Sequence, residues 1–495
     1  MIKPALDELK SSAEIKQFDI IPLSDEIYAD MATPIDVLKK LMNVSKHCFI
    51  LESAEDTKTW GRYTFLGFDP LLEITCIDGL FNINSAESKS FKTDNPNKHI
   101  QEILDQHKSI KFDYLPPFTG GLVGYFAYDY AKYCEPTLKL SAVDEECFND
   151  VDLMLFDKVI TFDHYRQKII LIVNIKTNNL EAEYERGKKQ LEELKKIIKT
   201  GSNQSAGFTQ IPSANIKSEF NALFTKEEYC RMVMNAKNHI KEGDIFQVVL
   251  SNRYDADFEG SIFDTYRVLR TINPSPYMFY FSGSNLEIAG ASPETLVKLH
   301  NGKLFTYPLA GTRKRGETDE EDIALEKDLL ADEKELAEHN MLVDLGRNDL
   351  GKISKFGSVK VDNYLSILRF SHVMHIGSTV SGDIREDKTA LDAINAVLPA
   401  GTLSGAPKIR AMQIINEQEK NKRGIYGGAI GYFDFTGNMD TCIAIRIVYK
   451  RNNKVFIRSG AGIVADSDPE SEYQECVNKS AAVMKALKLS SGGIE

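Results

Sequence analysis

Short apolar runs joined by tight turns constrain the fold of this chain more than any other feature of its sequence. Residues 424–464 are interpreted as three such strands, and residues 286–316 as a meander that turns at Asn301-Gly302. In residues 71–84, Asp78-Gly79 separates two alternating runs and can adopt the positive φ values of a type I′ hairpin turn. Strands joined by hairpins pair antiparallel, which leaves the helices to cover the sheets from outside. The sequence therefore predicts the α+β class, with mostly antiparallel β-sheets in a sandwich-like core and helices packed outside.

Another segment, residues 116–136, is rich in glycine and aromatic residues. Glycines in such a segment can bind phosphate, or they can let neighbouring backbones approach closely. Because the segment reads as a strand and a turn, we favour close backbone packing over phosphate binding.

One polar stretch divides the chain. Residues 200–218 (TGSNQSAGFTQIPSANIKS) are low in apolar residues and follow a lysine-rich helix end, which is typical of a linker. A chain of 495 residues is long enough for two domains. We expect an N-terminal domain over residues 1–200, a linker over 201–218 and a second domain over 219–490.

Composition excludes several classes of protein. The net charge of −12 argues against a nucleic-acid partner, and no apolar run is long enough to cross a membrane. The first residues are polar, which predicts no signal peptide. Seven cysteines, an odd number without CxxC spacing, are most simply interpreted as reduced thiols. We therefore expect a cytoplasmic protein.

Two pairs of glutamates recur at the same spacing, Glu335 with Glu338 and Glu472 with Glu475, each beside the apolar stripe of a predicted helix. A single pair of this kind is more often a solvated helix face. Two pairs on buried faces are costly unless a cation joins them. An all-oxygen set of ligands without a cysteine or histidine cluster suits Mg²⁺. The sequence therefore predicts a Mg²⁺ site at the centre of an active site.

Many short motifs follow one another in a fixed order from residue 291 onward. They are ASPE, PLAGTRKRG, KELAEHNMLVDLGRND, VMH, GTLSGAPK, IYGGAIGY, AIR and GAGIV…ESEYQE. In this order they resemble the catalytic domain of the chorismate-utilising enzymes, over about residues 220–490. With the N-terminal ILES segment (50–53), the resemblance extends to the large subunits of anthranilate synthases. Many motifs in one order are more specific than a single short glycine motif.

The resemblance implies a reaction and a metal. Ammonia would add at C2 of chorismate while the C4 hydroxyl leaves, and elimination of pyruvate would give anthranilate, in the first committed step of tryptophan biosynthesis. Glu338 and Glu475 would bind Mg²⁺ directly, and Glu335 and Glu472 would hold its water ligands.

The source of ammonia is predicted from an absence. No cysteine lies between glycines, as in a GxCxG segment for glutamine hydrolysis. The chain should therefore use free ammonium alone, or glutamine through a separate glutamine amidotransferase subunit. The family resemblance implies a heterotetramer of two large and two small subunits.

The resemblance also assigns roles to individual residues. Glu294 would be the general acid for the leaving hydroxyl, and Thr402 would help to position the substrate. His375 would act in the elimination, either as the base or by orienting the intermediate. The implied substrate-binding residues are Thr312, Tyr426, Arg446, Gly460, Ala461, Gly462 and Lys479, with Lys408 as a further candidate.

These residue types suit a substrate with two carboxylates. The fork of Arg446 can bind both oxygens of a carboxylate, and successive N–H groups of a Gly-rich turn at residues 460–462 can bind an anion. Each residue alone has a plainer interpretation. Arg446 could be a surface arginine, His375 a structural histidine and Glu294 a carboxylate at the end of a strand. The order of the motifs favours the functional interpretation.

Two positions distinguish members of the family. Water-adding isochorismate and salicylate synthases carry a lysine base where this chain has Gln247, and glutamine cannot take a proton from water at neutral pH. Many aminodeoxychorismate synthases carry a nucleophilic lysine where this chain has Ala310, which forms no covalent adduct. Direct attack of ammonia at C2 is therefore favoured. The alternatives are an aminodeoxychorismate synthase that lacks this lysine and a non-catalytic tryptophan-binding subunit.

The ILES segment resembles the feedback-inhibition segment of anthranilate synthases, with NPSPYMFY (273–280) as the other wall of a pocket for L-tryptophan. Residues 1–200 would then be a regulatory domain and residues 219–490 the catalytic domain. The residues implied in inhibitor binding are Glu52, Ser53, Pro276, Tyr277, Met278, Tyr432 and Cys442.

Overall fold

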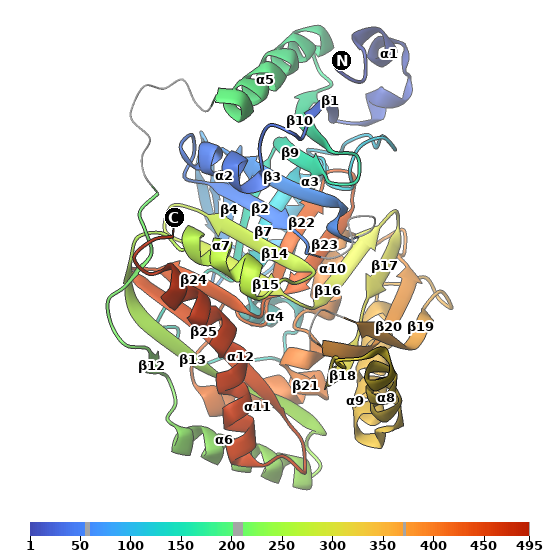
Figure 1. Ribbon diagram of the computed structural model, residues 1–495. Helices are drawn as coiled ribbons and strands as arrows, with labels where there is room; N and C mark the ends of the chain where they lie inside the picture. Colours follow the sequence, from blue (N-terminus) through green and yellow to red (C-terminus); the bar gives the residue numbers. More distant parts are fainter. Residues whose placement is uncertain (55–59, 201–210, 370–372, 495) are drawn as a thin grey trace.

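Two large β-sheets form the centre of the molecule, and helices cover their outer faces (Figure 1). The computed structural model describes residues 1–54, 60–200, 211–369 and 373–494. Within these ranges the named strands pair antiparallel, from the β1–β10 pair (residues 20–28 and 168–176) to the β7–β8 pair (residues 121–126 and 151–156). The predicted α+β class is confirmed.

The first sheet combines strands from both sides of the predicted linker. In spatial order it contains β1 (Ile20–Tyr28), β10 (Lys168–Lys176), β9 (Lys158–Asp163), β3 (Tyr63–Phe68), β2 (Cys48–Glu52), β14 (Tyr277–Ser282), β15 (Glu287–Ser292), β24 (Ile447–Arg451), β25 (Lys454–Ile463), β13 (Gln247–Glu259) and β11 (Asn215–Ile216), with β12 (Asn221–Ala222) and β21 (Gly405–Ala406) paired to β13. The junction between early and late strands is the β2–β14 pair, in which Glu52 lies opposite Met278.

The second sheet is mixed in the same way. Its order is β18 (Leu309–Lys314), β20 (Val373–Asp383), β17 (Lys303–Thr306), β16 (Thr295–His300), β23 (Met439–Ile443), β22 (Ala429–Asp434), β7 (Gly121–Phe126), β8 (Val151–Phe156), β4 (Leu72–Ile77), β5 (Leu80–Asn84) and β6 (Lys89–Lys92), with β19 (Lys360–Arg369) paired to β20. Here β7 and β22 join early and late segments of the chain.

Helices cover the outer faces of the sheets. They are α1 (Leu6–Ser11), α2 (Pro34–Met42), α3 (Pro96–Asp105), α4 (Ala131–Cys134), α5 (Leu180–Thr200), α6 (Lys226–Lys241), α7 (Phe263–Ile272), α8 (Asp319–Ala331), α9 (Glu333–Gly351), α10 (Ala390–Val397), α11 (Lys408–Glu419) and α12 (Pro469–Ser490). A core that includes residues of α2, α5, α7 and α12 covers the first sheet, and one that includes α3, α9 and α10 lies against the second. A third core, rich in phenylalanine and tyrosine, fills the space between the sheets.

Local turn and cap signals are confirmed. Asp78 and Gly79 have φ values of 46° and 78°, and Asn301 and Gly302 have 53° and 77°, as their hairpin turns require. Thr225 forms a capping box at the start of α6.

Two strand counts from the sequence are wrong. Residues 424–464 form four strands rather than three, and residues 152–175 lie in three strands rather than a pair. In both regions the chain crosses between the sheets, so β8 and β9 are consecutive but belong to different sheets. Only Asp157 and Lys158 mark the crossing between β8 and β9. A polar step this short is equally compatible with a hairpin turn, because the strands on either side of it are almost fully buried.

Glycines let the backbones of neighbouring strands approach in the second sheet. Gly431 of β22 lies opposite Gly124 of β7, within the segment for which the sequence predicts close packing. A Cβ atom on Gly431 would lie 2.0 Å from the carbonyl oxygen of Asp440, and one on Gly124 would lie 2.1 Å from that of Asp152. Neither backbone atom can move aside without disturbing the sheet.

We expect Gly431→Ala to lower the free energy of unfolding by about 1–3 kcal/mol, the usual cost of overpacking. Urea denaturation followed by circular dichroism measures this change. Gly351→Ala at the end of α9 is the matched control, because nothing lies within 4 Å of the added methyl group. Equal stability of the two variants would contradict the packing argument.

Other predictions concern thiols, membranes and the linker. All seven cysteines are free thiols, and no described helix is long and apolar enough to cross a membrane. Residues 201–210 of the predicted linker lie outside the described residues, while residues 211–218 include β11, which pairs with β13. The division into domains stays a prediction.

Candidate active site

The predicted general acid contacts the predicted positioning residue. Glu294 lies between β15 and β16, and Thr402 lies in the short 3₁₀ helix η4 (Gly401–Leu403). The Thr402 hydroxyl donates a hydrogen bond to Oε1 of Glu294 over 2.9 Å. Burial raises the pKa of Glu294 to about 7, against the opposing effects of Thr402 and Lys479. A substantial fraction of this carboxyl group is therefore protonated at neutral pH, as a general acid requires.

A second pair of predicted residues lies on two adjacent strands, where Thr312 of β18 is opposite His375 of β20. Nδ1 of His375 lies 2.9 Å from the carbonyl oxygen of Gly311 and 3.1 Å from the Thr312 hydroxyl. Because a carbonyl oxygen only accepts, Nδ1 carries the proton, and Nε2 is the basic nitrogen of the neutral ring. Burial lowers the pKa of His375, which favours this neutral form.

The four predicted metal-site glutamates come from two helices, Glu335 and Glu338 from α9 and Glu472 and Glu475 from α12. Partial desolvation by neighbouring protein atoms raises the pKa of Glu338, although its side chain is exposed, and the negative charges of Glu335 and Glu475 add to this effect. Burial and Glu475 likewise raise the pKa of Glu472. The two helices therefore direct mutually repelling carboxylates toward one region, where a cation would relieve the repulsion.

The four carboxylates are ligands of the type that Mg²⁺ prefers, but their oxygen atoms are not clustered around a single point. Within the described residues, no three of the four glutamates bring carboxylate oxygens within 4.8 Å of one another. Lys479 forms an ion pair with Glu475 over 2.6 Å and so supplies part of the positive charge.

The prediction that these glutamates lie on buried faces is wrong for two of them. The side chains of Glu338 and Glu475 are exposed, whereas Leu342 of α9 and Cys476 of α12 are buried. Both glutamates therefore lie at the exposed edge of the apolar stripe of their helix.

Four of the predicted substrate-binding residues lie close together beside α12. Arg446 donates a hydrogen bond to the carbonyl oxygen of Lys479, and Lys479 Nζ donates one to the carbonyl oxygen of Gly460 over 3.1 Å. A Cβ atom on Gly460 would lie 3.0 Å from the Tyr426 hydroxyl, so a side chain there would crowd this group. The structure thus brings Tyr426, Arg446, Gly460 and Lys479 together.

The predicted Gly-rich turn at residues 460–462 is wrong. Gly460, Ala461 and Gly462 continue β25 and pair with Ser251, Leu250 and Val249 of β13. In a strand, successive N–H groups point in opposite directions, so these three residues cannot form an anion-binding nest. Glycine at position 462 instead leaves room for the side chain of Gln247, because a Cβ atom there would lie 2.8 Å from Nε2 of Gln247.

Lys408 and two basic residues that sequence reasoning missed complete this region. Lys408 connects two parts of the protein interior: its Nζ donates hydrogen bonds to Asp349 and to the carbonyl oxygen of Val397, both over 2.8 Å. Arg313 lies 3.9 Å from Oε1 of Glu335. The charge of Lys334 acts on both Glu338 and Glu472. Only their positions next to Thr312 and Glu335 in the sequence could have indicated these two basic residues.

The constellation can be compared with known proteins. A sequence profile described as chorismate binding enzyme matches residues 46–485. The chain belongs to the family of chorismate binding enzymes. Two relatives named anthranilate synthase component 1 are 46% identical over 99% of both chains (Acetivibrio thermocellus) and 44% identical over 98% of both (Aquifex aeolicus).

Two solved structures share the fold of this chain. The crystal structure of anthranilate synthase component I from Streptococcus pneumoniae matches with a TM-score of 0.74 and 37% identity, over 92% of this chain and 98% of that one. The menaquinone-specific isochorismate synthase of Escherichia coli matches with a TM-score of 0.69 and 19% identity, over 97% of each chain, which shows the fold alone.

In this chorismate binding enzyme, the predicted inhibitor-binding residues come from both sheets: Glu52 and Met278 from β2 and β14 of the first, and Tyr432 and Cys442 from β22 and β23 of the second. Glu52 accepts hydrogen bonds from Tyr266 and Arg270 of α7, and Met278 packs in the same outer core. The remaining members face the inter-sheet core or its rim: the Tyr277 hydroxyl lies 2.9 Å from that of Thr295, and Tyr432 and Cys442 are buried. Ser53 follows β2 directly, and Pro276 lines a hollow of about 790 Å³ that extends to β19 and β20.

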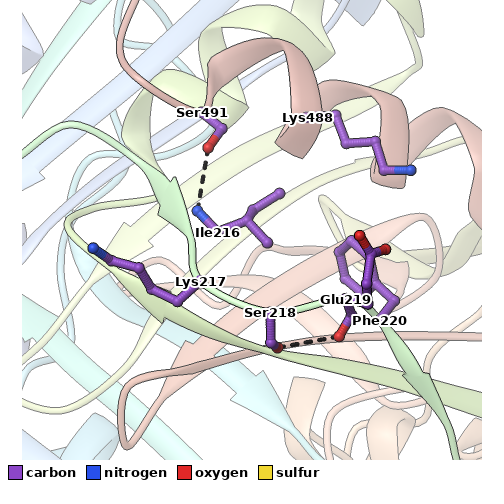
Figure 2. Close-up of a pocket in the computed structure, with 7 residues that line it drawn as sticks. All are labelled: Ile216, Lys217, Ser218, Glu219, Phe220, Lys488 and Ser491. Atoms are coloured by element: carbon purple, nitrogen blue, oxygen red, sulfur yellow. Dashed lines mark hydrogen bonds between the residues drawn. The ribbon is translucent and has the colours of Figure 1, made fainter.

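Two further hollows differ in their relation to the site. A cavity of about 50 Å³ adjoins Glu294 and Thr402, which is room for water rather than for a ring. The hollow in Figure 2, about 420 Å³, is an open surface feature between residues 216–220 and the end of α12. The Ser491 hydroxyl accepts a hydrogen bond from the Ile216 N–H there, and no predicted site residue lines the hollow.

Proposed function

We propose that the chain is the large subunit of an anthranilate synthase. It would aminate chorismate at C2 with ammonia and eliminate pyruvate to give anthranilate, at the start of tryptophan biosynthesis. The observation that carries this proposal is the 46% identity to an anthranilate synthase component 1 over 99% of both chains. The contact between Glu294 and Thr402 supports it, because the reaction needs a protonated acid at the leaving hydroxyl.

The proposed roles of the residues follow from their surroundings. Glu294 would give its proton to the C4 hydroxyl as that group leaves. His375, neutral and basic at Nε2, would either take the C2 proton during elimination or orient the intermediate. Thr402 would hold Glu294 and the substrate, and Arg446, Tyr426 and Thr312 would bind the carboxylates. Gly460, Ala461, Gly462 and Lys479 would form the adjoining wall of this site.

Magnesium is the proposed cofactor. Glu338 and Glu475 would bind the ion, and Glu335 and Glu472 would hold its water molecules, since these carboxylates repel one another without a cation. When bound, Mg²⁺ would neutralise and orient the ring carboxylate of chorismate. Removal of Mg²⁺ by EDTA should abolish turnover, and Mg²⁺ should restore it.

The alternative amination route gives a different product. An aminodeoxychorismate synthase would keep the enolpyruvyl group, and Ala310 excludes only the covalent form of that reaction. A pyruvate assay with ammonium and Mg²⁺ therefore tests the proposed function. One mole of pyruvate per mole of chorismate is the expected result. Chorismate consumption without pyruvate would overturn it, and no consumption would favour a non-catalytic tryptophan-binding subunit.

From the raised pKa of Glu294 we predict how chorismate turnover depends on pH. Because its pKa is about 7, its protonated fraction falls above pH 7, and kcat/KM should fall with it, about tenfold per pH unit at high pH. The assay must hold the concentration of neutral ammonia constant, since ammonia itself titrates. A kcat/KM that is flat from pH 6 to 9 under this condition would contradict the assignment of Glu294 as the acid.

Tryptophan is the proposed inhibitor. It would bind near Glu52, Ser53 and Pro276–Met278 with Tyr432 and Cys442. This site would span the junction of β2 and β14, between a regulatory domain (1–200) and a catalytic domain (219–490) joined by the linker 201–218. The pairing of Glu52 with Met278 places both predicted segments side by side. Added L-tryptophan should suppress turnover. Turnover unchanged by tryptophan, together with no measurable tryptophan binding, would overturn this part of the proposal.

Ammonia is proposed to come from a partner. The name component 1 of the relatives implies a second component. We infer a glutamine amidotransferase subunit in a cytoplasmic heterotetramer of two large and two small subunits. The isolated chain should then use ammonium but release no glutamate from glutamine, and glutamate release by the isolated chain would contradict this inference.

A further inference from the structure

A cavity of about 200 Å³ lies between the two sheets, away from the active site and the predicted inhibitor residues. The end of β14, the start of β15 and Arg451 of β24 line it from the first sheet. Residues of β4, β5, β7 and β8 line it from the second sheet. None of its lining residues belongs to the catalytic constellation or to the predicted tryptophan site.

The two sheets contribute opposite charges to this cavity. Arg451 comes from the first sheet, and Asp152 and Glu73 come from the second. Among the described residues no ion pair within 4.0 Å joins Arg451 to either carboxylate, although Arg451 does influence Asp152 electrostatically. Packed sheets lie about 10 Å apart, so a small molecule with both charges can bridge the two walls.

Polar groups in this cavity lack partners. The Tyr125 side chain is only 2% exposed, and its hydroxyl makes no hydrogen bond of acceptable geometry, although the backbone N–H of Asn149 lies near it. Nε of Arg451 is also buried without a partner. The Phe148 ring, with its centroid 5.3 Å from the guanidinium carbon, supports the side chain. Unpaired buried polar groups are rare because they cost free energy, and these two adjoin an empty space.

Among the described residues, no basic side chain forms an ion pair with Asp152 or Glu73. Burial, with the negative charge of Glu73, raises the pKa of Asp152 to about 7, although Asn149 and Arg451 act in the opposite direction. Asn149 donates to Oδ2 of Asp152 over 3.1 Å, and Asn84 donates to Oε2 of Glu73 over 3.3 Å. An ammonium group between these carboxylates would supply the missing charge.

We propose that this cavity binds a free α-amino acid with an apolar side chain. Its carboxylate would contact the fork of Arg451 and the Tyr125 hydroxyl, and its ammonium group would contact Asp152 and Glu73. Met154, Phe281 and Ile288 would surround the side chain. The volume is below the roughly 300–1,000 Å³ of sites for drug-sized ligands, which favours one small metabolite.

Isothermal titration calorimetry of the full chain tests this proposal, with L-leucine, L-methionine and L-phenylalanine as probes. We expect one of them to bind with a stoichiometry of one. Its analogues without the amine or without the carboxylate should bind at least tenfold more weakly, because each loses one charged wall.

Variants identify the cavity as the binding site. Arg451→Gln and Asp152→Asn should each weaken binding at least tenfold, with Arg451→Lys intermediate because it keeps the charge but loses the fork. Arg385→Gln and Asp387→Asn, which alter an exposed ion pair elsewhere, are the matched controls and should bind as the parent chain does. Thermal unfolding checks that each variant is folded. If some of the three cavity variants do not fold, the binding test can be made with any one that does.

Three results would overturn the proposal. One is no binding of any probe at millimolar concentration, and another is unchanged affinity in folded Arg451→Gln or Asp152→Asn. The last is displacement of the probe by L-tryptophan in both the parent chain and the Arg451→Gln variant, which would place the probe at the predicted inhibitor residues instead. The binding measurement is independent of chorismate turnover and therefore of the proposed function.

Discussion

Replacing Glu294 by glutamine should reduce chorismate turnover by about 100- to 10,000-fold, the usual contribution of a general acid. Glutamine has nearly the same size and can still accept the hydrogen bond from Thr402, but it has no acidic proton to give. The variant should therefore fold normally and lose catalysis alone.

Steady-state kinetics with ammonium and Mg²⁺ measure this loss. Glu386→Gln, an exposed glutamate paired with Lys355, is the control and should keep full turnover. The residual activity of Glu294→Gln should also lose the decline above pH 7, because the group that titrates is gone. A variant with more than a tenth of the parental kcat, or with the same pH profile, would show that Glu294 is not the acid.

Replacing Glu419 by glutamine should lower the free energy of unfolding by about 3–5 kcal/mol, the usual cost of breaking a buried ion pair from one side. Glu419 of α11 accepts hydrogen bonds from Arg423 over 2.6 Å, from Arg458 of β25 over 3.1 Å and from the Ser251 N–H of β13 over 2.8 Å. All three charged side chains are almost fully buried. Loss of the carboxylate charge would leave two buried guanidinium groups without a counter-ion.

The effect of this network reaches the active site. Arg423 lies 5.8 Å from the ring centroid of Tyr426, so disorder in the network would also displace a proposed substrate-binding residue. Urea denaturation measures the stability change. Glu417→Gln, two residues earlier and exposed, is the matched control. Equal free energies of unfolding for the two variants would contradict the proposed contribution of this ion-pair network to stability.

The same network predicts a dependence of stability on pH. Burial alone would raise the pKa of Glu419, but Arg423 and Arg458 outweigh it and lower the pKa. A carboxyl group with a lowered pKa stabilises the folded state above its unfolded pKa of about 4.3 and loses this contribution as the pH falls. The stability difference between the parent chain and Glu419→Gln should therefore narrow below pH 4.

Local signals predicted much of the secondary structure. The Asp78-Gly79 turn and the capping box at Thr225 depend on residues within four positions of one another, and both are present. Long-range pairing was not predictable from the same signals. Residues of β8 and β9 are separated by one residue yet lie in different sheets, because a strand buried on both faces carries no mark of its sheet.

The candidate site shows the same limit. Glu294 and Thr402 are 108 positions apart, and the order of family motifs pointed to each residue but not to the hydrogen bond between them. Periodicity did place the glutamate pairs beside apolar stripes, but it could not show that the side chains of Glu338 and Glu475 are exposed rather than buried. The sequence analysis interpreted residues 460–462 as a turn because glycine is common in turns. In the structure they form a strand, and the two glycines leave room for the side chains of Tyr426 and Gln247.

The measurement that tests the central claim most directly is product analysis with ¹⁵N-ammonium. The purified chain is incubated with chorismate and Mg²⁺, and the product is identified by mass spectrometry and NMR. The account predicts anthranilate with ¹⁵N on the carbon next to the one that carries the carboxylate, in equal amount to pyruvate and reduced by added tryptophan. A 4-amino product that retains the enolpyruvyl group would contradict it and place the chain among the aminodeoxychorismate synthases.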